Sequence, residues 1–420
     1  MSGSLSPLGA LAAPGADRTL PPPPRRDQPP ATSLLITGLG RGGAETQLVA
    51  LSRYLQDRGW PLEVVSLLPA TIFAGERFVA ELESRGIAVW SPDIAAPGSV
   101  GPGLWRLLRH LRARRPQVLC TFMFHANVLG AILGRLAGVP VVVSSIRNER
   151  FGPRWREPVE AATQRLCDLT VVNSERVAGS LLARGIVERG RCRVIPNAVD
   201  LASFSPPDSP TGTSTPRRLG VPPEAFLWLA VGSLDPQKDH ASLLRATARL
   251  RRRRPGVRIA VAGDGPLRGR LRQLSREMSL EDVVHWLGRR HDVPDLLAAG
   301  DAFVSSSRWE GSPNAVLEAL ACALPVAATD VGGVRELVQH GRSGFLVPPG
   351  DTEALAAAME RVMDLPRDER HRMGRRGRES VQQRHDASTV LEQWRQLLSD
   401  AWRASRHRTE HRGRRVTRWA

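Results

Sequence analysis

The sequence is poor in lysine, cysteine and aromatic residues. Of its 59 basic residues, 58 are arginine and one is lysine, Lys238. The four cysteines form no CxxC pair and no Cys/His cluster with zinc spacing, so neither a zinc site nor a disulfide framework is expected. Aromatic residues make up 5% of the chain and do not interleave with the arginines at stacking positions, which argues against a nucleic-acid-binding protein.

Long hydrophobic runs are also missing. Residues 1–31 include Pro21–Pro24 and lack the continuous apolar core of a signal peptide, so we expect a disordered leader and a cytoplasmic location. The longest apolar stretch, Ala126–Ile146, contains Gly138 and Pro140, and this pattern predicts a helix, a turn and a buried strand instead of a membrane span. No D-x-D motif occurs, and we therefore expect no carboxylate-bound divalent metal.

The chain is strongly basic, with a formal net charge of +17 over 420 residues. Such a charge can indicate nucleic acid or acidic lipid as a partner. Here the arginines are spread along a sequence that is also rich in alanine, proline and glycine, which is typical of a GC-rich coding bias. We expect no nucleic-acid partner.

Short apolar runs alternate with longer amphipathic stretches in both halves of the chain. Continuous apolar runs are typical of strands buried on both faces, as in parallel sheets. The expected strands of the first half are Leu34–Thr37, Leu62–Leu67, Ile87–Trp90, Val118–Phe122, Val139–Ser145, Leu169–Asn173 and Arg193–Pro196, and those of the second half are Ala225–Gly232, Val257–Gly263, Val283–Leu287, Ala302–Ser306, Pro325–Thr329 and Gly344–Pro348.

This alternation predicts an α/β protein with two doubly wound, Rossmann-like domains that face each other across a cleft. The expected parts are a leader (1–31), an N-terminal domain (32–201), a proline-rich linker (202–218), a C-terminal domain (219–385), a helix that packs back on the N-terminal domain (386–402) and a disordered basic tail (403–420).

The first glycine-rich loop, Gly38–Gly43, matches the dinucleotide pattern GxGxxG after a predicted strand. An NAD-dependent oxidoreductase would carry an acid at the end of the next strand, but the only acid there, Glu63, lies at the other end. The alternative is a loop in which the bare amides of Gly42 and Gly43 approach a diphosphate closely.

The second half contains a pair of glutamates seven residues apart, Glu310 and Glu318, around a predicted helix start. Ser312 is a good helix cap and Pro313 suits the first helical position, so the free amides at Ser312–Asn314 would face the cleft and stabilise a diphosphate. Glu310 would lie close to the group attached to that phosphate, and Glu318 would accept hydrogen bonds from a vicinal diol such as a ribose.

In this context the two glutamates resemble the E-x7-E signature of retaining glycosyltransferases of family 4, which have a B-type, two-domain fold. The loop Gly40–Glu45 and the segments Ala323–Glu336 and Gly344–Asp351 are similar to family motifs and occur in the family's order. The resemblance spans about residues 33–400.

The resemblance implies roles for individual residues. Lys238 matches the family's phosphate-binding lysine, but Ser233 stands where the family has an arginine and supplies no charge. Arg41 and Arg147 are the candidates to compensate from across the cleft. His125 would contact the donor sugar, and Arg147 would line the acceptor pocket. The implied catalytic residues are Glu310, Lys238 and His125, and the implied donor-binding residues are Gly42, Gly43, Ser233, Lys238, Gly311, Ser312, Asn314 and Glu318.

The implied reaction is metal-independent transfer of a sugar, with retention, from a nucleoside-diphosphate sugar of the UDP or GDP type, without a further cofactor. The acceptor would be a sugar or a lipid-linked sugar in polysaccharide, lipopolysaccharide or glycolipid biosynthesis. A basic amphipathic helix at Leu104–Arg115 fits either a solvated surface or an anionic membrane on the cytoplasmic side. An NAD-dependent oxidoreductase and a sugar-nucleotide epimerase of the same fold remain the alternatives.

Overall fold

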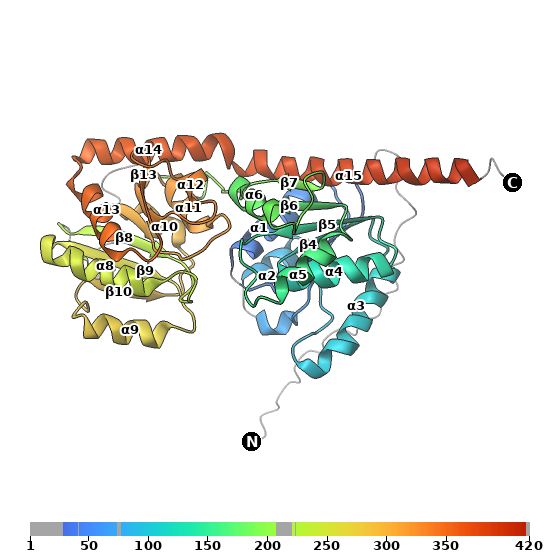
Figure 1. Cartoon of the computed structure of the whole chain (residues 1–420), viewed down its shortest axis with the longest axis horizontal. Coiled ribbons are helices and arrows are strands. Elements are labelled where there is room, and N and C mark those ends of the chain that lie inside the picture. The colour runs from blue at the N-terminus through green and yellow to red at the C-terminus, as the bar shows by residue number, and fades with distance from the viewer. Residues whose placement is uncertain (1–27, 41, 74–76, 207–220, 223, 417–420) are drawn as a thin grey trace, which may run out of the picture.

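The computed structural model describes residues 28–40, 42–73, 77–206, 221–222 and 224–416, and Arg41, most of the predicted leader and most of the predicted linker lie outside these ranges. Two α/β domains lie side by side along the long axis of the molecule, and a line of two helices runs across both (Figure 1). The predicted fold class is confirmed by two entirely parallel sheets.

The N-terminal sheet has seven parallel strands in the order β3-β2-β1-β4-β5-β6-β7. Its central strands are buried along their whole length, as their continuous apolar sequence predicts. The strands are β1 (Thr32–Ile36), β2 (Leu62–Ser66), β3 (Ala88–Trp90), β4 (Val118–Phe122), β5 (Val141–Ile146), β6 (Leu169–Val172) and β7 (Cys192–Val194).

The C-terminal sheet has six parallel strands in the order β10-β9-β8-β11-β12-β13. They are β8 (Phe226–Val231), β9 (Val257–Ala262), β10 (Val284–Gly288), β11 (Ala302–Ser305), β12 (Val326–Thr329) and β13 (Gly344–Val347). Each strand expected from the sequence is thus present within one or two residues of its predicted ends, and the strand order changes direction at β1/β4 and at β8/β11.

Helices cover both faces of each sheet (Figure 1). The N-terminal domain contains α1 (Gly43–Gln56), α2 (Arg77–Ser84), α3 (Val100–Arg114), α4 (Phe124–Leu136), α5 (Arg156–Gln164) and α6 (Glu175–Ala183), with short 3-10 turns η1 (Ala70–Phe73) and η2 (Pro97–Ser99). The C-terminal domain contains α8 (His240–Arg253), α9 (Arg268–Glu277), α10 (Val293–Ala298), α11 (Asn314–Ala321), α12 (Val334–Leu337) and α13 (Thr352–Asp364).

The apolar stretch Ala126–Ile146 forms most of α4, a turn and β5, as predicted. Within the part of the chain that the structure describes, no helix is both long and apolar enough to cross a membrane.

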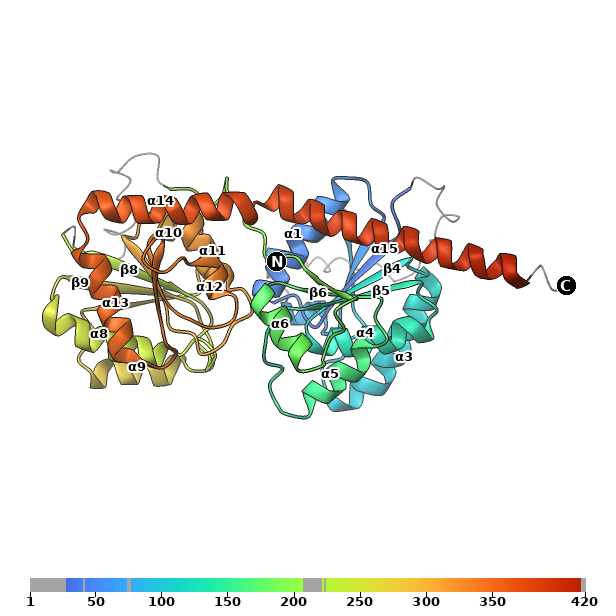
Figure 2. The same cartoon turned by 45° about the horizontal axis from the view of Figure 1, so that its top comes forward.

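Two C-terminal helices connect the domains (Figures 1 and 2). Helix α14 (Arg367–Arg384) packs on the C-terminal domain, and the chain then crosses at His385, whose Nδ1 lies 2.9 Å from the carbonyl oxygen of Asn197. Helix α15 (Ala387–Val416) packs on the N-terminal domain, where Trp394 lies in the apolar core with its ring 5.7 Å from that of Phe122.

The prediction of a disordered tail from residue 403 is wrong for the described residues, because α15 continues to Val416. The prediction relied on the loss of apolar periodicity after Trp402. Arginine is a good helix former, and a solvent-exposed helix needs no apolar stripe to continue from a well-packed start.

Candidate active site

Glu310 lies buried between the two domains, in the loop that follows β11, with 5% of its surface exposed. One carboxylate oxygen accepts hydrogen bonds from Lys238 Nζ at 2.6 Å and from Ser307 Oγ at 2.7 Å. The other accepts from Gln237 Nε2 at 3.0 Å. A buried carboxylate needs such a set of donors, and the result is an ion pair between two of the three predicted catalytic residues, Glu310 and Lys238.

Helix α11 begins at Asn314, one residue later than expected. Pro313 occupies the cap position with an extended backbone (ψ 118°), and no side chain caps the helix. The prediction that Ser312 is the cap and Pro313 the first helical residue is therefore wrong, because a ψ angle near 118° is not helical. The first amides of α11 have no side-chain cap and are left for another acceptor.

The first glycine-rich loop meets this helix start across the cleft. Helix α1 begins at Gly43 with Gly42 as its cap, again without a side-chain cap. Asn314 Nδ2 donates to the carbonyl oxygen of Gly43 at 3.1 Å. The side chain of Glu45 folds back over the loop, and a Cβ added to Gly42 would lie 2.3 Å from Glu45 Oε2. Burial raises the pKa of the Glu45 carboxyl to about 7.

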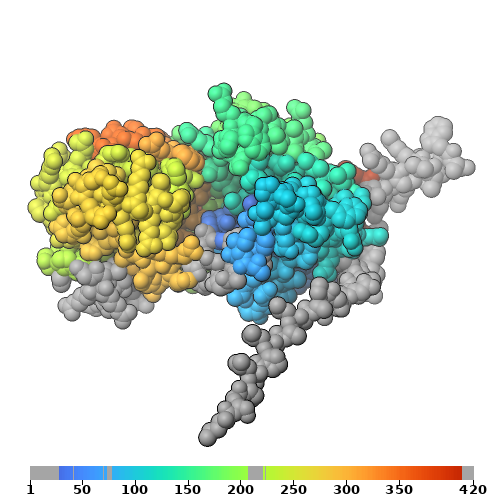
Figure 3. Space-filling model, turned by 90° about the horizontal axis from the view of Figure 1, so that it is seen from below, coloured from blue at the N-terminus to red at the C-terminus, as the bar shows by residue number. Residues whose placement is uncertain are grey.

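These residues line a cavity of about 450 Å³ between the domains, within the size range of small-ligand sites. A space-filling view shows a depression between the two lobes (Figure 3). Of the predicted site residues, the cavity is lined by Gly42, Gly43, Arg147, Ser233, Lys238, Glu310, Gly311, Ser312 and Asn314. Gly311 packs so tightly that an added Cβ would lie 2.1 Å from the carbonyl oxygen of Arg147.

Ser233 lies at the exposed edge of the cavity and supplies no charge. Its hydroxyl donates to the carboxylate of Asp235, which also accepts from the backbone N–H of Gln237 at 2.9 Å and of Lys238 at 3.2 Å. The loop after β8 therefore has its own hydrogen-bonding network, and Lys238 is its one cation.

Two predicted site residues do not line the cavity. His125 is largely exposed on the first turn of α4, with its Nε2 3.3 Å from Arg156 Nη2. Partial desolvation of its ring, together with the charge of Arg156, lowers its pKa. Glu318 is half-buried in the second turn of α11, where burial raises its pKa to about 7 and nearby Lys238 opposes the shift. Their contacts with a donor stay predictions.

The cavity also contains residues that the sequence analysis missed. Asn197 donates through Nδ2 to the carbonyl oxygen of Ser312 at 2.8 Å and to Asn314 Oδ1 at 2.6 Å. It follows the carboxyl end of β7, so the rule that functional side chains follow parallel strands would have found it. The sequence analysis also missed Gln237, whose side-chain amide donates to Glu310. Its position next to Lys238, the lone lysine, was the available signal.

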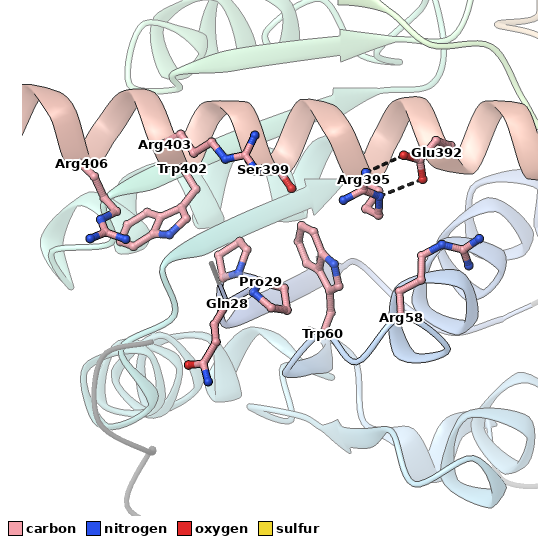
Figure 4. A pocket seen from close by; sticks show the side chains of 11 residues that line it. Gln28, Pro29, Arg58, Trp60, Glu392, Arg395, Ser399, Trp402, Arg403 and Arg406 are labelled. Carbon is pink, nitrogen blue, oxygen red and sulfur yellow. Dashed lines mark hydrogen bonds and ion pairs between the residues drawn. The ribbon is translucent and has the colours of Figure 1, made fainter. Parts of the chain in front are cut away.

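A second cavity, of about 430 Å³, lies at the amino ends of β1 and β2, on the side of the sheet away from the cleft. Figure 4 shows Pro29 and Trp60 facing α15, with Trp402 and several arginines along the helix. Its one carboxylate, Glu392, is already bound by Arg395 and by the Tyr54 hydroxyl at 2.9 Å. It shares no lining residue with the first cavity.

The chain matches two family models, one for each domain. Residues 41–203 match Glycosyltransferase Family 4, and residues 213–380 match Glycosyl transferases group 1. Among solved structures, the fold is similar to HepE of Anabaena in complex with UDP-glucose (TM-score 0.76, 24% identity, covering 88% of this chain and 99% of that one). It is also similar to sucrose-phosphate synthase of Thermosynechococcus elongatus (TM-score 0.76, 21% identity, 89% and 99% covered).

Curated relatives agree with the family models. A D-inositol 3-phosphate glycosyltransferase of Pseudarthrobacter chlorophenolicus is 31% identical over 355 residues, which is 77% of this chain and 83% of the relative. A UDP-Gal:alpha-D-GlcNAc-diphosphoundecaprenol alpha-1,3-galactosyltransferase of Escherichia coli is 30% identical over 268 residues, 61% of this chain and 69% of the relative. With both domains matched in order and the two parallel-sheet domains in place, the chain belongs to family 4 of the glycosyltransferases and is a glycosyltransferase of the B-type fold.

Proposed function

We propose that this glycosyltransferase uses a nucleoside-diphosphate sugar of the UDP or GDP type as donor and transfers the sugar with retention of anomeric configuration. One observation carries the proposal: Lys238, the uncapped start of α11 and the Gly42–Gly43 loop all face the same cavity. A cation and the backbone amides of helix starts without a side-chain cap are groups that bind a diphosphate.

The proposed reaction breaks the bond between the anomeric carbon and the diphosphate oxygen and forms a bond from the acceptor oxygen on the same face. The acceptor proton passes to an oxygen of the leaving diphosphate. Lys238 and the helix amides stabilise the negative charge that develops on the diphosphate, which is the transition-state term that a fixed site supplies best. Glu310, held in place by Lys238, orients the sugar.

We further propose that the reaction needs no divalent metal. In the described part of the chain no group of three His, Cys, Asp or Glu side chains is arranged to hold a metal ion. Lys238 and the amides offer an alternative source of charge for the leaving group. Transfer that persists in excess EDTA is the expected result, and transfer that requires added Mg²⁺ or Mn²⁺ would reject this part of the proposal.

The acceptor is proposed to be a sugar or a lipid-linked sugar in the biosynthesis of a polysaccharide or glycolipid. The name of the Escherichia coli relative describes transfer to a diphosphoundecaprenol-linked sugar, and the other relatives include a putative colanic acid biosynthesis glycosyltransferase of Escherichia coli. We propose a location at the inner face of the cytoplasmic membrane, since α3 and α4 present exposed apolar side chains and arginines on the N-terminal domain.

The family assignment favours transfer over the NAD-dependent oxidoreductase that Gly38–Gly43 suggested. Of that loop, Gly42 and Gly43 line the cavity, while Gly38 and Gly40 do not. A sugar-nucleotide epimerase with the same fold would interconvert nucleotide sugars without an acceptor. Detection of a sugar transferred to an acceptor therefore distinguishes a glycosyltransferase from an epimerase.

The donor proposal is tested by a thermal-shift panel of UDP-, GDP- and ADP-sugars. A donor at 100 times its Kd would stabilise the wild type by about 2.7 kcal/mol. We expect Lys238→Ala to weaken binding by about 10- to 100-fold, the cost of losing a hydrogen bond to a charged group. Arg252→Ala, on the exposed end of α8, is the matched control and should behave as wild type. A wild type that no nucleotide sugar stabilises would refute the donor assignment.

A further inference from the structure

Arg147 is a cation in the cavity without a matching anion. It follows β5 and lines the cavity from the N-terminal domain. Its Nη2 donates to Asn197 Oδ1, whereas its Nη1 is buried and has no hydrogen-bond acceptor. Among the described residues, no carboxylate lies within ion-pair distance of Arg147, while Lys238 is paired with Glu310 at 2.6 Å.

An unpaired buried cation is costly, and Arg147 remains charged despite that cost. Burial lowers the pKa of its guanidinium to about 10, which leaves it protonated at neutral pH. A charge held in this way is stabilised by an anion that enters the site. An anion that enters the cavity beside Arg147 would offset this cost.

Asn197 places this cation beside the start of α11. The same side chain that accepts from Arg147 donates to the carbonyl oxygen of Ser312 at 2.8 Å and to Asn314 Oδ1 at 2.6 Å. The carbonyl oxygen of Arg147 also lies against Gly311. The Arg147 guanidinium and the first turn of α11 thus converge on the same part of the cavity.

The other cavity arginines are engaged differently. The guanidinium of Arg150 lies over the ring of Trp309, with its central carbon 5.1 Å from the ring centre. Arg156 lies over the ring of Phe124 at 4.8 Å and donates to the carbonyl oxygen of Phe151 at 3.3 Å. Both use aromatic faces or a carbonyl group as partners, and neither is linked to the start of α11 in the way that Arg147 is.

We propose that Arg147 binds the diphosphate of the donor from the N-terminal domain and supplies the positive charge that Ser233 does not supply from the C-terminal domain. The inference rests on the proposed nucleoside-diphosphate donor. It makes the diphosphate a bridge between the domains, because Lys238 and the α11 amides hold it from one side and Arg147 from the other. A planar guanidinium is suited to two phosphate oxygens at once.

The experiment compares a nucleoside diphosphate with the matching nucleoside monophosphate by calorimetry, using the base that the donor panel selects. For Arg147→Gln we expect the Kd of the diphosphate to rise by about 10- to 100-fold and that of the monophosphate by less than about threefold. Ser233→Arg added to Arg147→Gln should restore at least about tenfold of the lost affinity, because it returns a cation to the clamp from the other domain.

Arg147→Lys keeps the charge but loses the planar guanidinium that donates to two phosphate oxygens, so we expect an intermediate diphosphate affinity. The same variant serves as a folded comparison if Arg147→Gln has a low Tm. Arg154→Gln, exposed in the same loop and outside the cavity, is the matched control.

An unchanged diphosphate Kd with a raised acceptor KM would overturn the proposal and assign Arg147 to the acceptor. Equal losses for diphosphate and monophosphate, without rescue by Ser233→Arg, would overturn it in favour of a structural role. A wild type that binds neither nucleotide would refute the donor proposal itself.

Discussion

At the residue scale, Glu318 is an acid that titrates near neutral pH in the donor half of the molecule. Burial raises its pKa to about 7, so the carboxyl is mostly protonated at pH 6 and mostly ionised at pH 8. An ionised carboxylate accepts stronger hydrogen bonds from a vicinal diol than a protonated carboxyl does. We therefore expect the affinity for a nucleoside to increase as the pH rises through 7, by about tenfold between pH 6 and pH 8.

The measurement uses the nucleoside, because a phosphate has its own ionisation near pH 6. Glu318→Gln should give an affinity that varies by less than about threefold over the same range, since the amide does not titrate. Glu379→Gln, an exposed acid on α14, should retain the wild-type pH profile. A wild-type profile that is flat, or that falls with pH, would remove Glu318 from the ribose contact.

The raised pKa of Glu318 affects stability in the opposite direction: the free energy of unfolding decreases as the pH rises, whereas the nucleoside affinity increases. Glu318 holds its proton in the folded protein up to about pH 7 but loses it near pH 4.5 in the unfolded chain. Its contribution to the free energy of unfolding is therefore largest below pH 4.5 and is lost as the pH rises from there through 7. The apo Glu318→Gln variant should lack this part of the fall in Tm between pH 5 and pH 8, as a comparison of melting curves with wild type would test.

At the element scale, one carboxylate from the C-terminal domain lies on the start of a helix of the N-terminal domain. Glu336 of α12 accepts from Ser174 Oγ and the backbone N–H of Arg176, both at 2.8 Å, and from the backbone N–H of Glu175 at 3.1 Å. Arg176 adds an ion pair to Asp330 at 3.2 Å. The free amides and the dipole of a helix start stabilise an anion there by about 0.3–2 kcal/mol, so this contact stabilises the observed arrangement of the two domains.

We expect Glu336→Gln to shift the population toward a more open molecule and to lower kcat/KM by up to about 30-fold, the equivalent of 2 kcal/mol. Small-angle X-ray scattering should then give a larger radius of gyration than wild type, and a saturating nucleotide should reverse part of the difference. Glu369→Gln on α14 tests for a general effect of removing an acid from this domain. Equal radii and equal kcat/KM in wild type and Glu336→Gln would show that the contact does not control closure.

The strands could be predicted from the sequence, but several features of the site could not. Apolar runs such as Val141–Ile146 are buried on both faces, so composition alone identifies them. The cap at Pro313 depended on a single ψ angle. Whether the His125 side chain lines the cavity depended on the rotation of α4 about its axis. Neither quantity is determined by local composition. Asn197 and Arg147 meet only because two loops of the N-terminal domain approach the start of α11, which is a tertiary contact.

At the scale of the whole molecule, the N-terminal domain has an exposed apolar and basic surface that suits an anionic membrane. Trp105 on α3 is 57% exposed, and Leu136 on α4 is 58% exposed. Arg109 and Arg112 follow Trp105 at spacings of four and seven residues, which places all three on one face of the helix, and Arg112 Nη2 donates to the carbonyl oxygen of Leu136 at 3.3 Å. Apolar side chains that enter the lipid boundary and arginines that meet anionic headgroups act together in such surfaces.

We expect the protein to sediment with liposomes that contain anionic lipid and to be released as ionic strength rises. The double variant Arg109→Gln/Arg112→Gln should lose about 2 kcal/mol, or about 30-fold in partitioning at low salt. Trp105→Ala should weaken binding at every salt concentration, because it removes apolar contact area and no charge. Ile72→Ala removes an equally exposed apolar side chain from η1, outside this surface, and should leave binding unchanged. Partitioning that does not depend on salt, anionic lipid content or any of the three surface positions would mean that the arginines and Trp105 form only a solvated face. The enzyme would then have to meet its acceptor without binding the bilayer through this surface.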